Sequence, residues 1–171
     1  MSKPLYTVQH VANFFLEKGD SEGRELTSLK LLKLVYIAYG WVLALTGKKL
    51  FEDEIQAWQH GPVVPALYHE FKHFRKDPIF ERAACFDLDS FDYTTPSIPE
   101  SDKDVVLILQ RVWDAYKGFS AWTLRNKTHA IGSPWHQVYN DSERETVIPD
   151  DIIATYFKDR IGEYLNVGIA P

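Results

Sequence analysis

Cysteine is nearly absent from this sequence. Its 171 residues include one cysteine, Cys85, which excludes an internal disulfide bond and a zinc site built from several thiolates. Such sparing use of cysteine is typical of proteins in a reducing compartment. The stretch from Met1 to Tyr6 also lacks the cationic start and apolar core of a signal peptide. We therefore expect a cytoplasmic protein.

Positive charge is scarce as well. The chain carries 19 lysines and arginines against 24 aspartates and glutamates, so its formal net charge is −5. Its pI is about 5.7. A general nucleic-acid-binding protein needs a basic stripe along one face. We therefore do not expect nucleic acid as a partner, whereas a basic protein partner fits this charge.

No apolar run reaches the length of a membrane span. The longest extends from Leu31 to Leu45 and is interrupted only by Lys33 and Gly40. A span needs roughly 20 residues, whereas a helix that is apolar on all sides is typical of a protein core. The chain is 45% hydrophobic and can enclose such a helix. We predict that this run is the buried central helix and that the protein has no membrane partner.

Apolar residues recur at helical spacing along most of the chain. The predicted helices cover residues 7–18, 27–46, 63–75, 101–117, 120–130, 133–139 and 149–161. Thr27, Ser101, Ser120 and Ser133 are the predicted N-caps of four of them. Short strands are expected at 48–51 and 54–58, paired with each other, and at 85–88. The predicted fold is mainly α. It is a single domain, residues 1–171, formed by a helical bundle around the central hydrophobic helix with a small two- or three-stranded antiparallel β-ribbon.

Residues 58–65 form the most constrained turn of the sequence, Trp-Gln-His-Gly-Pro-Val-Val-Pro. Gly61 can adopt a positive φ and Pro62 cannot donate a backbone N–H, so we expect a sharp reversal between a short strand and a helix. Pro65 fits the first turn of that helix. These residue types determine how two elements meet, and they supply no chemistry of their own.

A series of short motifs follows in a fixed order through the chain. They are Leu29-Lys30-Leu31-Leu32-Lys33-Leu34-Val35-Tyr36, Gly40-Trp41, Leu50-Phe51, Glu54-Ile55, Ala57-Trp58, Gly61-Pro62-Val63-Val64-Pro65, Tyr68, Leu124, Thr128-His129 and Pro134-Trp135. Their order and spacing resemble those of the Panacea family, the SocA-like antitoxin domain. The resemblance covers roughly residues 5 to 140.

The resemblance implies a bacterial or phage protein that is encoded beside a toxin and neutralises this cognate toxin by direct binding. Some members of the family act instead as adaptors that deliver a toxin to a protease. The family offers no catalytic residues, so the resemblance implies neither enzyme activity nor a cofactor. We interpret the motif positions as structural. They include Lys30, Lys33, Tyr36, Trp58, Gly61, Pro62, Val63, Pro65, Tyr68, His129 and Trp135.

Lys30 and Lys33 lie three residues apart and therefore share one side of the predicted central helix. One interpretation is that their stems cover apolar surface while the amines reach water. The other is that the amines pair with an acidic partner or with an internal carboxylate such as Glu54. Tyr36 and Trp58 are expected in the core, although both residue types are frequent at binding sites.

One motif favours a different class of protein, a zinc-dependent hydrolase. His69-Glu70-Phe71-Lys72-His73 matches H-E-x-x-H, in which two histidines on one helix face hold zinc and the glutamate activates water. A catalytic zinc needs a third protein ligand, and the candidates are Glu81, Asp87, His129 and His136. None of them has a diagnostic spacing, and Lys72 places a cation beside the metal position. We interpret His69 and His73 as surface histidines and keep the zinc site as the alternative.

A thiol–imidazole pair, formed by Cys85 with His129 or His136, is a weaker alternative for enzyme chemistry. The sequence leaves the distance between these side chains open.

Two segments are candidates for a partner-binding surface. The helix after the Gly-Pro turn offers His69, Lys72 and His73 on a rigid scaffold. The segment 77–100 offers three aromatic residues, Phe86, Phe91 and Tyr93, which are more than a solvated loop needs. These rings either dock a partner or pack onto the bundle.

Overall fold

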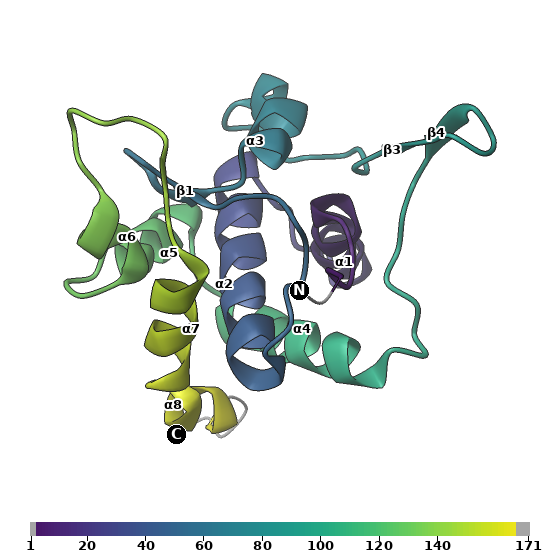
Figure 1. The fold of residues 1–171 in the computed structure, drawn as a ribbon. Helices are drawn as coiled ribbons and strands as arrows, with labels where there is room; N and C mark the ends of the chain where they lie inside the picture. Colours follow the sequence, from purple (N-terminus) through teal and green to yellow (C-terminus); the bar gives the residue numbers. More distant parts are fainter. Residues whose placement is uncertain (1–2, 167–171) are drawn as a thin grey trace.

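The computed structural model describes residues 3–166. A helix of nineteen residues, α2 (Ser28–Thr46), runs through its middle, with α1 (Val8–Ser21), α4 (Lys103–Tyr116), α5 (Ala121–Thr128) and α7 (Asp150–Lys158) packed around it (Figure 1). Thr27 caps the start of α2 by accepting a hydrogen bond from the backbone N–H of Lys30, and Gly47 ends it with a φ of 70°. The predicted central helix is confirmed.

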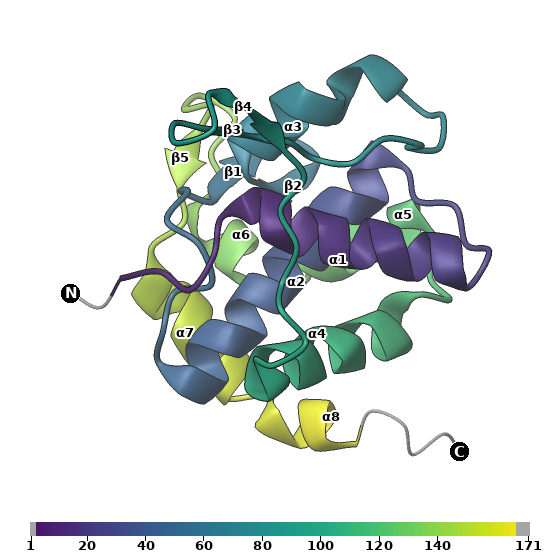
Figure 2. The same ribbon diagram turned by 90° about the vertical axis from the view of Figure 1, so that its right-hand side faces the viewer.

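The length and composition of α2 would suit a membrane span, but its surroundings are protein. In its most apolar window, 78% of the helix is buried inside the molecule. Figure 2 shows α1 crossing in front of α2, with α4 below and α3 (Pro65–Phe71) above. The apolar composition of α2 is therefore explained by its central place in the bundle.

Gly40 brings α7 unusually close to the middle of α2. A Cβ atom at this position would lie 2.1 Å from Cε2 of Phe157, so no larger residue fits without displacing that ring. Phe157 packs edge-on against Trp41 and Tyr36, with ring centroids 5.0 Å and 5.9 Å away. The glycine thus allows an aromatic side chain of α7 to lie directly against the central helix.

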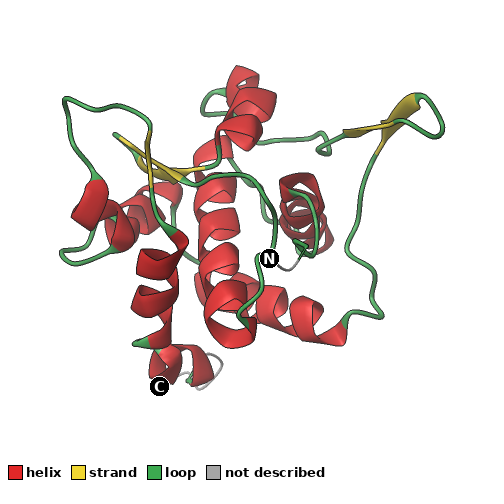
Figure 3. Cartoon of the chain, viewed as in Figure 1, coloured by secondary structure: helices red, strands yellow, loops and turns green. Residues whose placement is uncertain are grey.

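The β structure is small and antiparallel (Figure 3). In the larger sheet β1 (Gln56–Trp58) lies between β2 (Gly61–Val63) and β5 (Thr146–Val147). The second sheet is a hairpin of β3 (Cys85–Asp87) and β4 (Asp92–Thr94). The mainly α fold with a small antiparallel ribbon is confirmed.

The predicted strand at 48–51 is wrong. Lys49 and Leu50 accept backbone hydrogen bonds from Leu5 and Tyr6 instead, at 3.0 and 2.8 Å. These two contacts hold the N-terminal segment but do not extend into a ladder. The strand β1, which begins at Gln56, pairs instead with β2 and with β5. Of these two partners, β5 lies far along the chain.

Several helix boundaries differ from the predicted ones. The helix after the Gly-Pro turn ends at Phe71, and a turn of 3₁₀ helix, η1 (Lys72–Phe74), follows it. Asp102, rather than Ser101, caps α4. The predicted caps Ser120 and Ser133 are confirmed at α5 and α6 (Pro134–Val138). A short α8 (Ile161–Leu165) follows α7.

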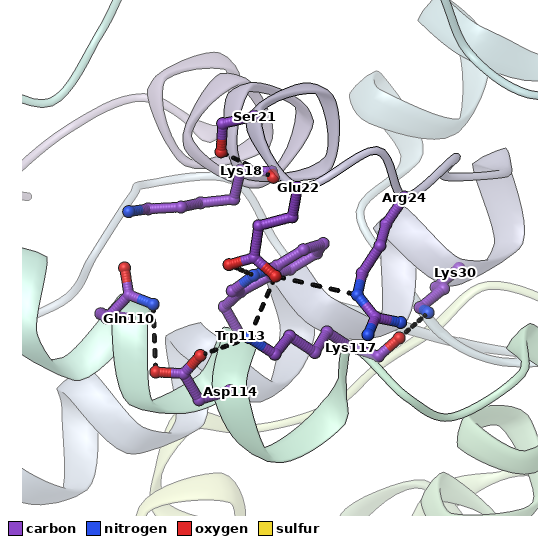
Figure 4. Close-up of polar contacts among 9 residues, drawn as sticks. All are labelled: Lys18, Ser21, Glu22, Arg24, Lys30, Gln110, Trp113, Asp114 and Lys117. Atoms are coloured by element: carbon purple, nitrogen blue, oxygen red, sulfur yellow. Dashed lines mark hydrogen bonds and ion pairs between the residues drawn. The ribbon is translucent and has the colours of Figure 1, made fainter.

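Polar contacts join α1, α2 and α4 at one end of the bundle (Figure 4). Glu22, which follows α1, accepts hydrogen bonds from Nε1 of Trp113 at 2.9 Å and from Nζ of Lys117 at 3.0 Å. These donors lower the pKa of the Glu22 carboxyl. Nζ of Lys117 also lies 2.9 Å from Oδ1 of Asp114. Lys30 donates to the backbone carbonyl of Lys117 at 2.6 Å.

Candidate partner-binding site

The family-motif residues of both halves of the chain meet at the turn between β1 and β2. Three backbone carbonyls of this turn face side chains of other elements. Nε1 of Trp135 donates to the carbonyl of Trp58 at 2.7 Å, and Nζ of Lys33 donates to that of Pro62 at 2.9 Å. Nε2 of His129 lies 3.2 Å from the carbonyl of Gln59. The turn is therefore fixed from α2, α5 and α6.

Gly61 is the residue on which this arrangement depends. Its φ is 106°, a conformation that residues with a Cβ rarely adopt. A Cβ atom here would also lie 2.8 Å from Nζ of Lys33 and 2.9 Å from Oγ1 of Thr128. The glycine therefore permits both the reversal and the close approach of the turn to α2 and α5.

The two lysines of α2 do not behave as expected. Lys33 has no exposed surface, so the interpretation that its amine reaches water is wrong. Burial, with the nearby charge of Arg125, lowers the pKa of Lys33 to about 7. Within residues 3–166, neither Lys33 nor Lys30 forms an ion pair with a carboxylate, and Glu54 is exposed. Both amines bond backbone carbonyls instead.

His129 sits between two carbonyl oxygens. Its Nδ1 lies 2.6 Å from the carbonyl of Arg125, while its Nε2 faces Gln59. A neutral imidazole can donate to one of these oxygens at a time. Burial lowers the pKa of His129. The ring packs edge-on against Trp135 at 3.7 Å between centroids, so this histidine helps to join α5 to α6 and the turn.

The aromatic motif residues differ in burial. Tyr36 is 3% exposed and lies in the core as predicted. Trp58 is half-buried, packing edge-on against Tyr68 with centroids 4.9 Å apart. Val63 is buried and Pro65 occupies the start of α3. The contact between Trp58 and Tyr68 therefore joins β1 to α3, the helix that follows the turn.

The H-E-x-x-H motif is not arranged as a zinc site. Oε1 of Glu70 accepts a hydrogen bond from the backbone N–H of Ala84 at 2.8 Å, which joins the segment just before β3 to α3. His73 lies in η1, so it is not on a continuous α-helix with His69, and its Nε2 lies 3.7 Å from Oε2 of Glu81. Residues 3–166 contain no cluster of three or more metal-ligating side chains. Glu70 is thus a structural residue here.

Cys85 is likewise placed apart from the two histidines proposed as its partners. Its Sγ lies 3.7 Å from Oγ1 of Thr7. His129 contacts Arg125 and Gln59, and Nδ1 of His136 accepts from the backbone N–H of Gly132 at 3.4 Å. The structure therefore does not assemble the thiol–imidazole pair.

The segment Cys85–Thr94, which we call the hairpin arm, projects from the body of the molecule (Figure 1). It presents four large apolar side chains that are 45–79% exposed: Phe86, Leu88, Phe91 and Tyr93. The rings of Phe91 and Tyr93 pack against Phe86, with centroids 5.5 and 5.3 Å away. The three predicted aromatic residues thus form one cluster that points to solvent and does not cover the bundle.

The hairpin arm is held at its base by one buried side chain of α1, Asn13. Its Nδ2 donates to the carbonyls of Ala83 and Pro96 at 2.9 and 2.8 Å, and its Oδ1 accepts from the N–H of Ala83 at 2.7 Å. Asn13 was not predicted as a site residue. An asparagine inside a helix is unfavourable unless its amide finds partners, and that was the available signal.

The tip of the hairpin arm is acidic and ordered by its own contacts. Asp87 accepts hydrogen bonds from the hydroxyl of Ser90 and from the backbone N–H of Asp89, at 2.8 and 3.0 Å. The Ser90 contact is the main reason why the pKa of Asp87 is lowered. With Asp92, three carboxylates alternate with the aromatic residues, and the arm itself contains no lysine or arginine. Its chemistry suits a basic surface with apolar pockets.

The motifs that meet at the turn define a class of protein. The chain belongs to the SocA-like Panacea family of antitoxins, because the family model described as "Antitoxin SocA-like, Panacea domain" matches residues 31–136. A particular relative is Antitoxin SocA of Caulobacter vibrioides (strain NA1000 / CB15N). It is 30% identical over 162 residues, which cover 94% of this chain and 86% of the relative. No solved structure matches the chain. The family predicted from the motifs is confirmed.

Proposed function

We propose that this protein is an antitoxin that neutralises a cognate protein toxin in the cytoplasm by binding it directly, without catalysing a reaction. Membership of the SocA-like Panacea family supports the toxin as partner. The observation that carries direct binding is the hairpin arm, whose aromatic cluster is exposed on a fixed base. Exposed aromatic side chains gathered in one place are typical of protein-binding sites.

The binding surface in this proposal combines the hairpin arm with the adjoining face of α3 and η1. His69, Lys72 and His73 are exposed on that face, and the bond from Glu70 to Ala84 joins it to the base of the arm. A stable complex buries on the order of 1,200–2,000 Å² in total. The arm alone is too small for that area, so the face of α3 supplies a second part of the contact.

Co-expression with the toxin encoded beside this gene tests the proposal. The intact chain should restore growth, and the Phe91→Ser and Tyr93→Ser double variant should fail, because removal of central aromatic contacts weakens binding by about 30-fold or more. Leu107→Ser, at a residue of α4 that is 55% exposed, is the matched control and should still restore growth. The toxin level should stay constant, since sequestration does not require its degradation.

Two results would contradict the proposal. Full rescue by the double variant would remove the hairpin arm from the binding surface. Rescue accompanied by rapid loss of the toxin protein would show delivery to a protease in place of sequestration.

A further inference from the structure

A second group of exposed apolar side chains lies on the side of the molecule away from the hairpin arm. Phe119, Trp122 and Ile131 are 37%, 57% and 89% exposed, on α5 and the turns that flank it. In Figure 1, α5 lies to the left of α2 and the hairpin arm extends to the right. We call these three residues, with Arg125 and Lys127, the α5 face.

The charge of the α5 face is opposite to that of the hairpin arm. Between Asp114 and Asp141 the sequence contains no acidic residue, although acidic residues outnumber basic ones in the whole chain. Within residues 3–166, no carboxylate pairs with Arg125 or Lys127. The surface therefore combines apolar side chains with two cations that have no anionic partner among the described residues.

The two cations are held directly over the aromatic rings. Cζ of Arg125 lies 4.8 Å from the ring centroid of Trp122, and Nζ of Lys127 lies 4.9 Å from that of Phe119. The guanidinium of Arg125 also donates from Nη1 to Oδ1 of Asn126 at 3.1 Å.

Several contacts hold the backbone beneath this surface in place. Ser120 caps α5 by accepting from the N–H of Thr123 at 3.0 Å, and Leu124 anchors the helix in the core with no exposed surface. The bond from Lys30 to the carbonyl of Lys117 fixes the chain just before Phe119. Ordered aromatic and arginine side chains on a rigid helix lose little entropy on binding, which favours a docking surface.

We propose that the α5 face docks an acidic peptide segment of a protein partner, one that carries apolar side chains between its carboxylates. Carboxylates would pair with Arg125 and Lys127, and the apolar side chains would cover Trp122 and Ile131. Two unpaired cations in a chain of net charge −5 are too few for nucleic acid, which needs an extended basic surface. This inference is independent of the toxin-binding role, because that role rests on a surface of opposite charge.

Fluorescence anisotropy with a synthetic probe tests the inference. The probe is a labelled peptide in which aspartate alternates with leucine and phenylalanine, and its comparison peptide has asparagine at every aspartate. The full chain should bind the acidic probe at least about tenfold more tightly than the asparagine peptide. Added salt should weaken the binding, because surface charge pairs are screened.

Two single variants locate the bound probe. Lys127→Glu and Trp122→Ser change exposed side chains, and each should weaken binding of the acidic probe by about tenfold or more. The matched controls Lys103→Glu and Lys158→Glu reverse exposed charges on α4 and α7 and should have no comparable effect. Circular dichroism melting curves of all four variants establish that they fold.

Several results would overturn the inference. These are no binding at millimolar probe, equal binding of the two peptides, and unchanged binding by Lys127→Glu and Trp122→Ser. Tighter binding of a single-stranded oligonucleotide or of anionic lipid vesicles than of the acidic probe would also overturn it, since the surface would then serve another class of partner.

Discussion

Lys33 is a buried cation whose amine bonds a backbone carbonyl of the Gly-Pro turn. Its pKa in the folded protein is about 7, whereas an unfolded chain keeps the lysine pKa near about 10.4. Between these values the unfolded state binds more protons than the folded state, so the free energy of unfolding rises with pH. Below the lower value the folded protein must hold the charged amine in its interior, which is the least favourable condition.

This charge balance gives a prediction for pH. From about pH 7 to about pH 9.5, the stability of the intact chain should rise by up to about 1.4 kcal/mol per pH unit through Lys33. Lys33→Met lacks the titrating amine, so its stability should change less over the same range. Urea denaturation at a series of pH values measures the difference. Parallel profiles for the two proteins would contradict the assignment of a lowered pKa to Lys33.

Gly61 gives a second prediction at the scale of single residues. Gly61→Ala should destabilise the protein for two reasons, the strained φ and the contact of the new Cβ with Lys33 and Thr128. Gly23→Ala is the matched control, because Gly23 has a φ of 63° but open space around it. We expect about 1–2 kcal/mol for the control and about 1–3 kcal/mol more for Gly61→Ala. Urea denaturation measures the free energy of unfolding of both variants. An equal loss for Gly61→Ala and Gly23→Ala would contradict the role of close packing at the turn.

At the scale of elements, the hairpin arm depends on α1. Asn13 bonds both chain segments at the base of the arm, so Asn13→Ala should leave the carbonyls of Ala83 and Pro96 without their donor. Hydrogen exchange at Ala83 and in the arm should then become faster, while α2 stays protected. Gln110→Ala, which removes an exposed bond to Asp114, is the control and should leave the arm unchanged. Unaltered exchange at Ala83 in Asn13→Ala would contradict the conclusion that Asn13 holds the base of the hairpin arm.

The sequence specified the elements whose signals are local. The central helix followed from an apolar run between Thr27 and Gly47, and Ser120 and Ser133 identified two helix starts. The partners of β1 could not be read in this way, because β5 lies far along the chain and is two residues long. The second strand of the hairpin arm, β4, was not predicted, because all three of its residues are exposed and carry no apolar alternation.

The candidate partner-binding site was likewise predicted only in part from the sequence. The segment with Phe86, Phe91 and Tyr93 was identified as a candidate surface because aromatic residues are unusual in a solvated loop. The position of the arm depends on the bonds from Asn13 of α1 to the carbonyls of Ala83 and Pro96, far along the chain, which no local pattern encodes. The buried position of Lys33 was missed for the same reason, because its acceptor is the carbonyl of Pro62.

At the scale of the whole molecule, a rigid helical scaffold carries two exposed aromatic surfaces of opposite charge. The acidic hairpin arm and the basic α5 face extend from different sides of the bundle (Figure 1). The motif residues Lys33, Gly61 and Trp135 hold the turn between β1 and β2. This distribution is suited to recognition of protein partners, and it separates the residues that maintain the fold from those that meet a partner.

Calorimetric titration of the purified toxin into the purified chain measures whether the hairpin arm binds the toxin. We expect a stoichiometric complex with the intact chain and with Leu107→Ser. For the Phe91→Ser and Tyr93→Ser double variant, we expect an affinity weakened by about 30-fold or more. Undiminished affinity of a folded double variant would show that the arm does not bind the toxin.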